Sequence, residues 1–199
     1  MQFSTLALAA LSMGSAIAGA ISGAPAYTTV YQSVADVNVV VQQQHDIIVD
    51  LTAHIAANAV VAVDVVVQIE AALQIISASI GSLGYPVLEL GNAGSYPLNH
   101  DQLTTVPDLA HNYQSILVHV EAVANILTAL NIKADVFVNI KAELQVILAL
   151  SASITAHIFA YIQVAAPVYI KVFVQIKSIV VNIQALIAVV VSVACKISL

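Results

Sequence analysis

The amino-acid sequence predicts an all-α protein, an antiparallel bundle of about five helices. Hydrophobic residues make up 60% of the 199 residues and charged residues only 8%, whereas a typical globular domain has about 25% charged residues. Neither glycine nor proline occurs between Ala26 and Ile80, and residues 108–199 contain one proline, Pro167. Polar residues recur at multiples of seven, which indicates one face of a helix. They are Asp36, Gln43, Asp50 and Asp64.

The many valines, and alternating stretches such as residues 168–175, also resemble β-strands. Strands average five to six residues and need turns between them. A stretch of fifty residues without glycine or proline offers no place for tight turns, so helices are the better interpretation. Valine is a mediocre helix former, so we expect these helices to depend on packing.

The spacing of glycine, proline and polar residues gives the expected elements. A cluster of seven glycines and prolines between Gly81 and Pro107 predicts a loop over about 81–106. Pro107 is expected in the first turn of the third helix. Further breaks are placed at Asn58 and Asn131. The expected helices span 31–56, 58–80, 107–130 and 132–165, with a fifth from Pro167 to near Cys195.

The N-terminus has the pattern of a secretory signal peptide. An apolar run from Leu6 to Leu11 is followed by small residues with A-x-A sites that end at Ala18 or Ala20. We therefore expect residues 1–18 to be removed and residues 19–199 to form a single helical domain. Cys195 is the one cysteine, so no internal disulfide can form. A buried thiol is the favoured interpretation, and an intermolecular bridge is the alternative.

The sequence excludes several kinds of chemistry. It contains no arginine and five lysines, so it lacks the basic surface that nucleic-acid binding requires. It has no G-x-S-x-G, H-E-x-x-H, P-loop or G-x-G-x-x-G motif, and we expect no enzyme activity and no cofactor. Asp46, Asp50 and His54 share one helix face and could approach a metal ion. The same spacing is typical of a solvated stripe, which we favour, and no metal site is predicted.

The apolar character itself is the strongest functional signal. A bundle buries one face of each helix, so a chain with such narrow polar stripes leaves apolar surface exposed or lining a cavity. Exposed surface would bind hydrophobic materials, and a cavity would hold an acyl chain. A candidate pocket is formed by five aromatic residues, with ordinary core packing as the alternative. They are Phe137, Phe159, Tyr161, Tyr169 and Phe173.

The C-terminal half resembles the fungal hydrophobic surface-binding protein A family, which includes cell-wall galactomannoproteins. The resemblance covers about seventy residues in detail and most of the mature chain in layout. It lies in Leu130-Asn131-Ile132-Lys133, Phe137, Leu144, Leu148, Leu150, Thr155, Phe159 and Ala165-Ala166-Pro167. The resemblance implies a secreted, extracellular or cell-wall protein that binds hydrophobic polymers, lipid or fatty acid. It also implies recruitment of a secreted esterase, and it brings no catalytic residues.

Three alternatives remain beside a surface-binding protein. Residues 144–170 and 178–194 lack charged side chains and approach the length of a membrane span, which would suit an integral membrane protein. A removable C-terminal anchor signal is less well supported because no polar spacer precedes the tail. A fatty-acid carrier would hold its ligand inside the bundle. The sequence does not decide whether the apolar excess faces outward or inward.

Secretion separates the secreted alternatives from an integral membrane protein. We expect the mature chain in the culture medium without detergent, because the leader is too short to span a bilayer and is followed by a cleavage site. The measurement is an immunoblot of medium and washed cell membranes. Recovery only from membranes after detergent extraction would contradict the prediction and favour the integral membrane alternative.

Overall fold

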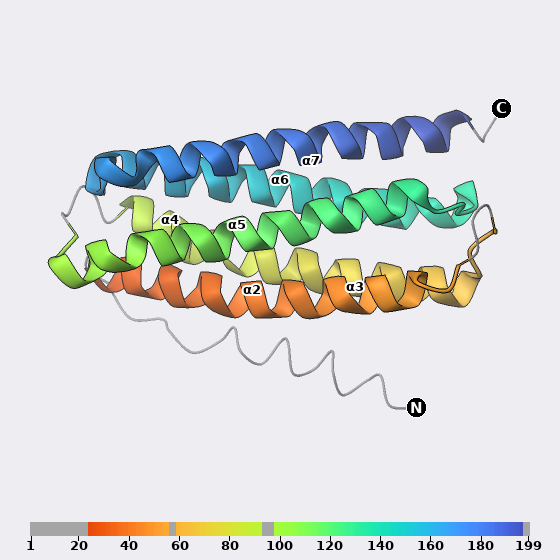
Figure 1. Ribbon diagram of the computed structural model, residues 1–199, viewed down its shortest axis with the longest axis horizontal. Coiled ribbons are helices and arrows are strands. Elements are labelled where there is room, and N and C mark those ends of the chain that lie inside the picture. Colours follow the sequence, from red (N-terminus) through yellow and green to blue (C-terminus); the bar gives the residue numbers. More distant parts are fainter. Residues whose placement is uncertain (1–23, 56–58, 93–97, 197–199) are drawn as a thin grey trace.

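The computed structural model describes residues 24–55, 59–92 and 98–196 (Figure 1). The expected signal peptide lies outside these residues. The described chain is helical: α2 (Ala24–Thr52), α3 (Val63–Ser82), α4 (Gly84–Asn92), α5 (His100–Ala129), α6 (Ala134–Ala165), the 3-10 turn η2 (Pro167–Tyr169) and α7 (Ile170–Lys196). The predicted fold class is confirmed, and its five long helices pack against one another.

The five long helices of the described chain form a closed ring. α2 packs against α3, α3 against α6, α6 against α7, α7 against α5, and α5 against α2. α4 lies at one end, against α6 and α2 (Figure 1). Successive long helices run antiparallel, yet three pairs of ring neighbours are parallel: α2 with α5, α3 with α6, and α5 with α7. Each long helix therefore turns one face to the interior of the ring and the opposite face to solvent.

A strict alternation of three and four residues builds the interior. In α5 the buried side chains at 106, 109, 113, 116, 120, 123 and 127 follow this alternation, with Ala110, Leu117 and Ala124 buried beside them, and α6 repeats the pattern from Phe137 to Tyr161. This spacing averages 3.5 residues, the repeat of helices that pack with their side chains interdigitated. Almost all of these side chains are apolar. Among the described residues, the buried polar ones are Ser151, at an interior position of α6, and Thr155 one turn further along that helix.

Two connecting segments meet at one end of the ring. The first joins α2 to α3, and the second joins α5 to α6, which are not ring neighbours. The two segments are joined where the Val61 N–H donates to the Asn131 carbonyl at 3.0 Å. Along the helices, the Ser77 hydroxyl donates to the Glu143 carboxylate at 2.9 Å and holds α3 beside α6. The break expected at Asn131 is confirmed, whereas Asn58 lies outside the described residues.

The predicted loop over 81–106 is wrong in part. Gly81 lies inside α3, α4 occupies Gly84–Asn92, and α5 already begins at His100. The start of α5 is set by a reciprocal cap that satisfies N–H groups otherwise left free at a helix end. The Asn99 side chain accepts from the Gln102 N–H at 2.9 Å, and the Gln102 side chain accepts from the Asn99 N–H at 3.2 Å. Residues 93–97 are not described.

The placement of Pro107 is also corrected. We expected it in the first turn of a helix, but it lies in the eighth position of α5. Proline offers no N–H to the carbonyl of Leu103 and crowds it. The helix continues because Val106, Leu109 and Ala110 are fully buried on its inner face, so packing outweighs the local cost.

Because Pro107 lies inside α5, we predict that Pro107→Ala stabilises the protein. The side chain is exposed, so alanine leaves the core intact and restores a helical N–H. We expect the free energy of unfolding in urea to rise by about 1–3 kcal/mol. Pro86→Ala is the matched control, because Pro86 lies in the first turn of α4, where a missing N–H costs little. Equal effects of the two substitutions would contradict the explanation.

Candidate functional site

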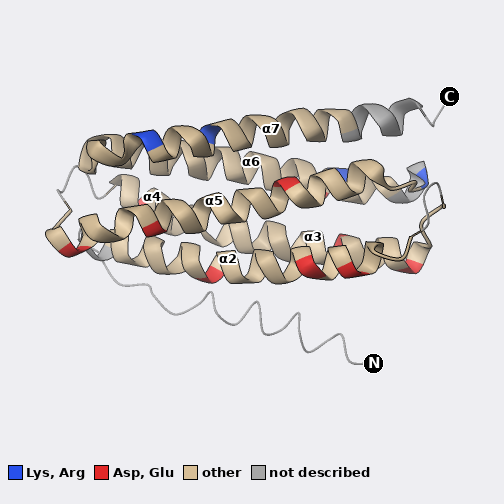
Figure 2. Cartoon of the chain, viewed as in Figure 1, with Lys and Arg blue, Asp and Glu red and all other residues tan. Residues whose placement is uncertain are grey.

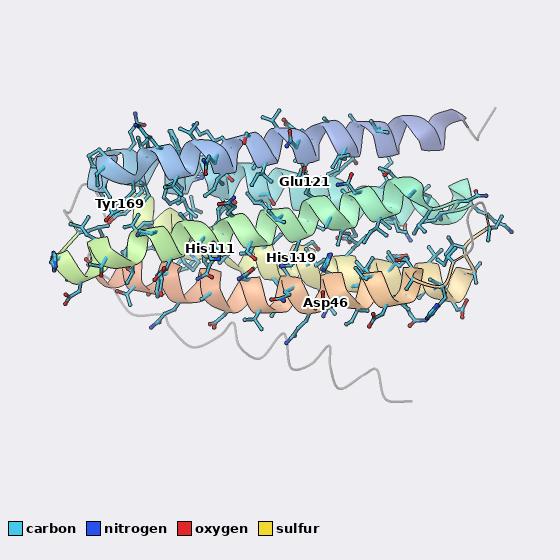
Figure 3. The ribbon with its side chains drawn as sticks, in the orientation of Figure 1. Asp46, His111, His119, Glu121 and Tyr169 are labelled. Carbon is cyan, nitrogen blue, oxygen red and sulfur yellow. The ribbon has the colours of Figure 1, made fainter. Side chains whose placement is uncertain are left out.

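The five aromatic residues of the predicted pocket do not all meet. Phe137 lies near the start of α6, and Phe159 lies 22 residues further along the same helix, which is about 33 Å at 1.5 Å per residue. Phe159 and Tyr161 near the end of α6 lie close in the chain to Tyr169 and Phe173, at the turn from α6 to α7. Figure 3 labels Tyr169 at this end of the molecule. Phe137 therefore cannot share a pocket with the other four.

The four remaining aromatic residues differ in their surroundings. Phe173 is fully buried, and Tyr161 is nearly so; burial raises the pKa of the Tyr161 hydroxyl. Tyr169 and Phe159 are partly exposed. The Lys177 ammonium lies 3.3 Å from the centre of the Phe159 ring, a cation–π contact between α7 and α6. This end of the bundle thus combines a buried aromatic core with a cationic rim.

The acidic stripe on α2 lies open to solvent. Asp46 and Asp50 are exposed on α2, and exposed His54 lies just after that helix. In the part of the chain that the structure describes, no three or more His, Cys, Asp or Glu side chains gather so that they could hold a metal ion. The Cys195 side chain lies outside the described side chains.

A polar seam, missed in the sequence, runs between the parallel helices α2 and α5. It consists of three pairs, which we call the α2–α5 seam: Tyr27–Thr105, Asn38–Asn112 and His45–His119. The Tyr27 and Thr105 hydroxyls lie 3.0 Å apart, the Asn38 amide donates to the Asn112 carbonyl oxygen at 3.5 Å, and the imidazole centres lie 4.9 Å apart. Burial raises the pKa of Tyr27 to about 12. On α5 the three partners are seven residues apart, which was the signal available in the sequence.

A second polar cluster that was not predicted from the sequence lies in the interior of the ring. The Tyr113 hydroxyl of α5 crosses to α6, where it donates to the Ser151 carbonyl and lies 2.9 Å from the Thr155 hydroxyl. Burial raises the pKa of Tyr113 well above its usual range. The Ser151 hydroxyl is fully buried and has no hydrogen-bond partner. A small residue at this interior position leaves room for the phenol to reach the helix backbone.

Charge is divided unevenly around the outside of the ring. The described acidic side chains of α2 and α5 are Asp36, Asp46, Asp50, Asp101, Asp108 and Glu121. By contrast, residues 144–170 contain no charged side chain, and the described charges of α7 are Lys171 and Lys177 (Figure 2). Since α2 has α3 and α5 as its ring neighbours, it lies across the ring from α6 and α7. One side of the bundle is therefore acidic, and the other has few described charges, which are Lys141 and Glu143 of α6 and Lys171 and Lys177 of α7.

The almost uncharged side exposes many valines. We call it the α6–α7 face, defined by the exposed valines of α6, η2 and α7. They are Val138, Val146, Val164, Val168, Val174, Val181 and Val189. Between them lie alanine, serine, glutamine and asparagine, together with exposed His157, Lys171 and Lys177. This arrangement presents apolar area that is not interrupted by charge over the second half of α6.

Three segments of the described chain are long and apolar enough to cross a membrane. They are Val63–Asn92, Phe137–Ala165 and Pro167–Val189, and at most 39% of each hydrophobic window is buried within the bundle. More than half of each window thus lies on or near the outside of the ring. The apolar excess of the sequence is accordingly turned outward to a large extent.

Comparison with protein families, with curated protein sequences and with solved structures found no match for the chain. The function must therefore be argued from the chain's own residues.

Removal of the Tyr113 hydroxyl measures what the interior contacts contribute. We expect Tyr113→Phe to lower the free energy of unfolding by about 1 kcal/mol, since it removes a hydrogen bond inside a well-packed core. Urea unfolding is the measurement. Tyr85→Phe is the control, because Tyr85 is 65% exposed and should leave stability unchanged. A Tyr113→Phe protein as stable as the parent would show that the hydroxyl contributes nothing.

Proposed function

We propose that this chain is a secreted, non-catalytic protein that binds hydrophobic surfaces or lipids at the cell exterior. The observation that carries the proposal is the division of the ring into an acidic side and the α6–α7 face. A water-soluble protein that adsorbs to an apolar material needs both, because one side must stay hydrated while the other is dehydrated. Each Å² of apolar area removed from water contributes about 25 cal/mol.

The shape of the α6–α7 face suits an extended surface. Its valines come from two neighbouring antiparallel helices and continue from Val138 to Val189. A material with a broad apolar area could contact both helices at once. The resemblance to hydrophobic surface-binding proteins supports the same role, and with it a secreted esterase as a further partner.

Two other functions each have one supporting observation. An integral membrane protein is favoured by the three segments of spanning length. A fatty-acid carrier is favoured by the buried hydroxyls of Tyr113, Ser151 and Thr155, because the unpaired Ser151 hydroxyl could donate to a lipid carboxylate. The exposed acidic side argues against full immersion in lipid. An interior packed with alternating spacings of three and four residues argues against a ligand inside the bundle. Surface binding is therefore the favoured function.

The test is adsorption of the purified mature protein to hydrophobic polymer beads, with hydrophilic silica of equal area as the reference surface. Val174→Lys/Val181→Lys places two charges on the α6–α7 face, at valines that are 53% and 60% exposed. We expect roughly tenfold weaker binding, because two apolar contacts are lost and two charges must be dehydrated.

The matched control carries the same charges on the acidic side. Val39→Lys/Val118→Lys changes valines of α2 and α5 that are 55% and 46% exposed, and it should bind as the parent does. High salt should leave binding of the parent intact, since salt screens charge attraction but not apolar burial. Equal loss in both double variants, or no selective binding by the parent, would overturn the proposal.

A further inference from the structure

Two imidazoles face each other across the α2–α5 seam. The ring centres of His45 on α2 and His119 on α5 lie 4.9 Å apart, with the rings inclined by 49°. The Nδ1 atom of His45 lies 2.9 Å from a carboxylate oxygen of Asp46. Figure 3 shows Asp46 and His119 on the two neighbouring helices. Both imidazoles are partly shielded from solvent.

The other charged groups around this pair lie elsewhere. The Glu70 carboxylate accepts from Asn139 and Gln74, so it faces α6 and its own helix. On α7, which packs against the other side of α5, the described charges lie in the first third of the helix. The full set of charged and imidazole groups on the packed elements is Asp36 and Asp50 of α2, Asp64 and Glu70 of α3, Glu89 of α4, His100, Asp101, Asp108, His111 and Glu121 of α5, and Lys171 and Lys177 of α7. The groups that act on the charge of His119 are His45 and Asp46.

The local arrangement makes one protonation state costly. Burial and the neighbouring His45 lower the pKa of His119 below its ordinary value of 6.5, and Asp46 partly opposes this effect. With protons on both rings, two positive charges would lie about 5 Å apart, and a single exposed carboxylate would offset them only in part. Separation of the helices relieves the repulsion and lets water hydrate both rings.

We propose that the His45–His119 pair makes the bundle sensitive to acid, with protonation loosening α2 from α5. The pair forms the third of the three contacts that hold these parallel helices in register, and it lies towards the C-terminal ends of α2 and α5. Loosening here exposes interior side chains such as Val41 and Val120, which are buried in the closed ring. This property belongs to the bundle and does not require the proposed surface-binding function.

The direction of the pH effect follows from the lowered pKa. An unfolded chain binds a proton at His119 at a higher pH than the folded chain does, so stability decreases as the pH falls below 6.5. The decrease ends once the pH is below the lowered pKa of the folded protein. Above 6.5 the imidazole is neutral in both states, and this contribution to stability is complete.

The experiment compares urea unfolding of the full mature chain at about pH 7.5 and about pH 5, which bracket histidine titration. The folding equilibrium constant of the parent should fall roughly tenfold more than that of His119→Gln, which cannot be charged. His45→Gln should behave like His119→Gln and serves if that variant does not fold. His111→Gln is the control, because its side chain is exposed on the same helix, and it should retain the parent's loss.

Two further readouts distinguish a charge effect from lost packing. Asp46→Asn should enlarge the loss in acid, because the carboxylate that partly opposes the repulsion is gone. Amide hydrogen exchange at about pH 5 should be faster in α2 and α5 of the parent than in His119→Gln, with α6 unchanged. The proposal is overturned if His119→Gln loses as much stability as the parent, if Asp46→Asn reduces the loss, or if α6 loses protection equally.

Discussion

The parallel packing of α2 against α5 determines where the other helices can lie. Two helices that run the same way need a return path between them, and α3 with α4 provides it. α6 then returns beside α3, and α7 closes the ring between α6 and α5. Polar pairs inside the α2–α5 seam match only in one register, as polar residues in helical seams commonly do. The hydrogen bond between Val61 and Asn131 joins the α2–α3 connection to the α5–α6 connection, beyond the C-terminal ends of α2 and α5.

The ring of helices also explains how so apolar a chain can keep a hydrated side. Each helix contributes to the interior one row of buried residues spaced by three and four, and this row uses fewer than half of the helix's residues. The remaining apolar residues must face outward, and seven of the sixteen exposed large hydrophobic side chains of the described residues lie on α6, η2 and α7, which have few charges. The acidic residues of α2 and α5 supply hydration on the other side. The proposed adsorption and the proposed acid response therefore involve different sides of the same ring.

Helix positions were predictable where periodicity was long and uninterrupted. The regions of α2, α3, α6 and α7 followed from the absence of glycine and proline and from the polar stripes. The start of α5 was missed because glycine and proline suggested a loop, although Asn99 and Gln102 already carried the cap signature. Pro107 shows that burial of Leu109 and its neighbours can outweigh a local helix breaker. Of the predicted aromatic pocket, Phe137 lies at the other end of α6 from Phe159.

The sequence by itself determined the helical class, because fifty-residue stretches without turn residues and with 3.5-residue spacing admit little else. It also determined the excess of apolar surface, which composition alone sets. Only the tertiary structure decided that α2 and α5 lie in parallel, that His45 meets His119 and that Tyr113 reaches Ser151. These contacts join residues 38 to 78 positions apart in the chain. Periodicity tells which face of a helix is buried, whereas the partner of that face depends on how all five helices close the ring.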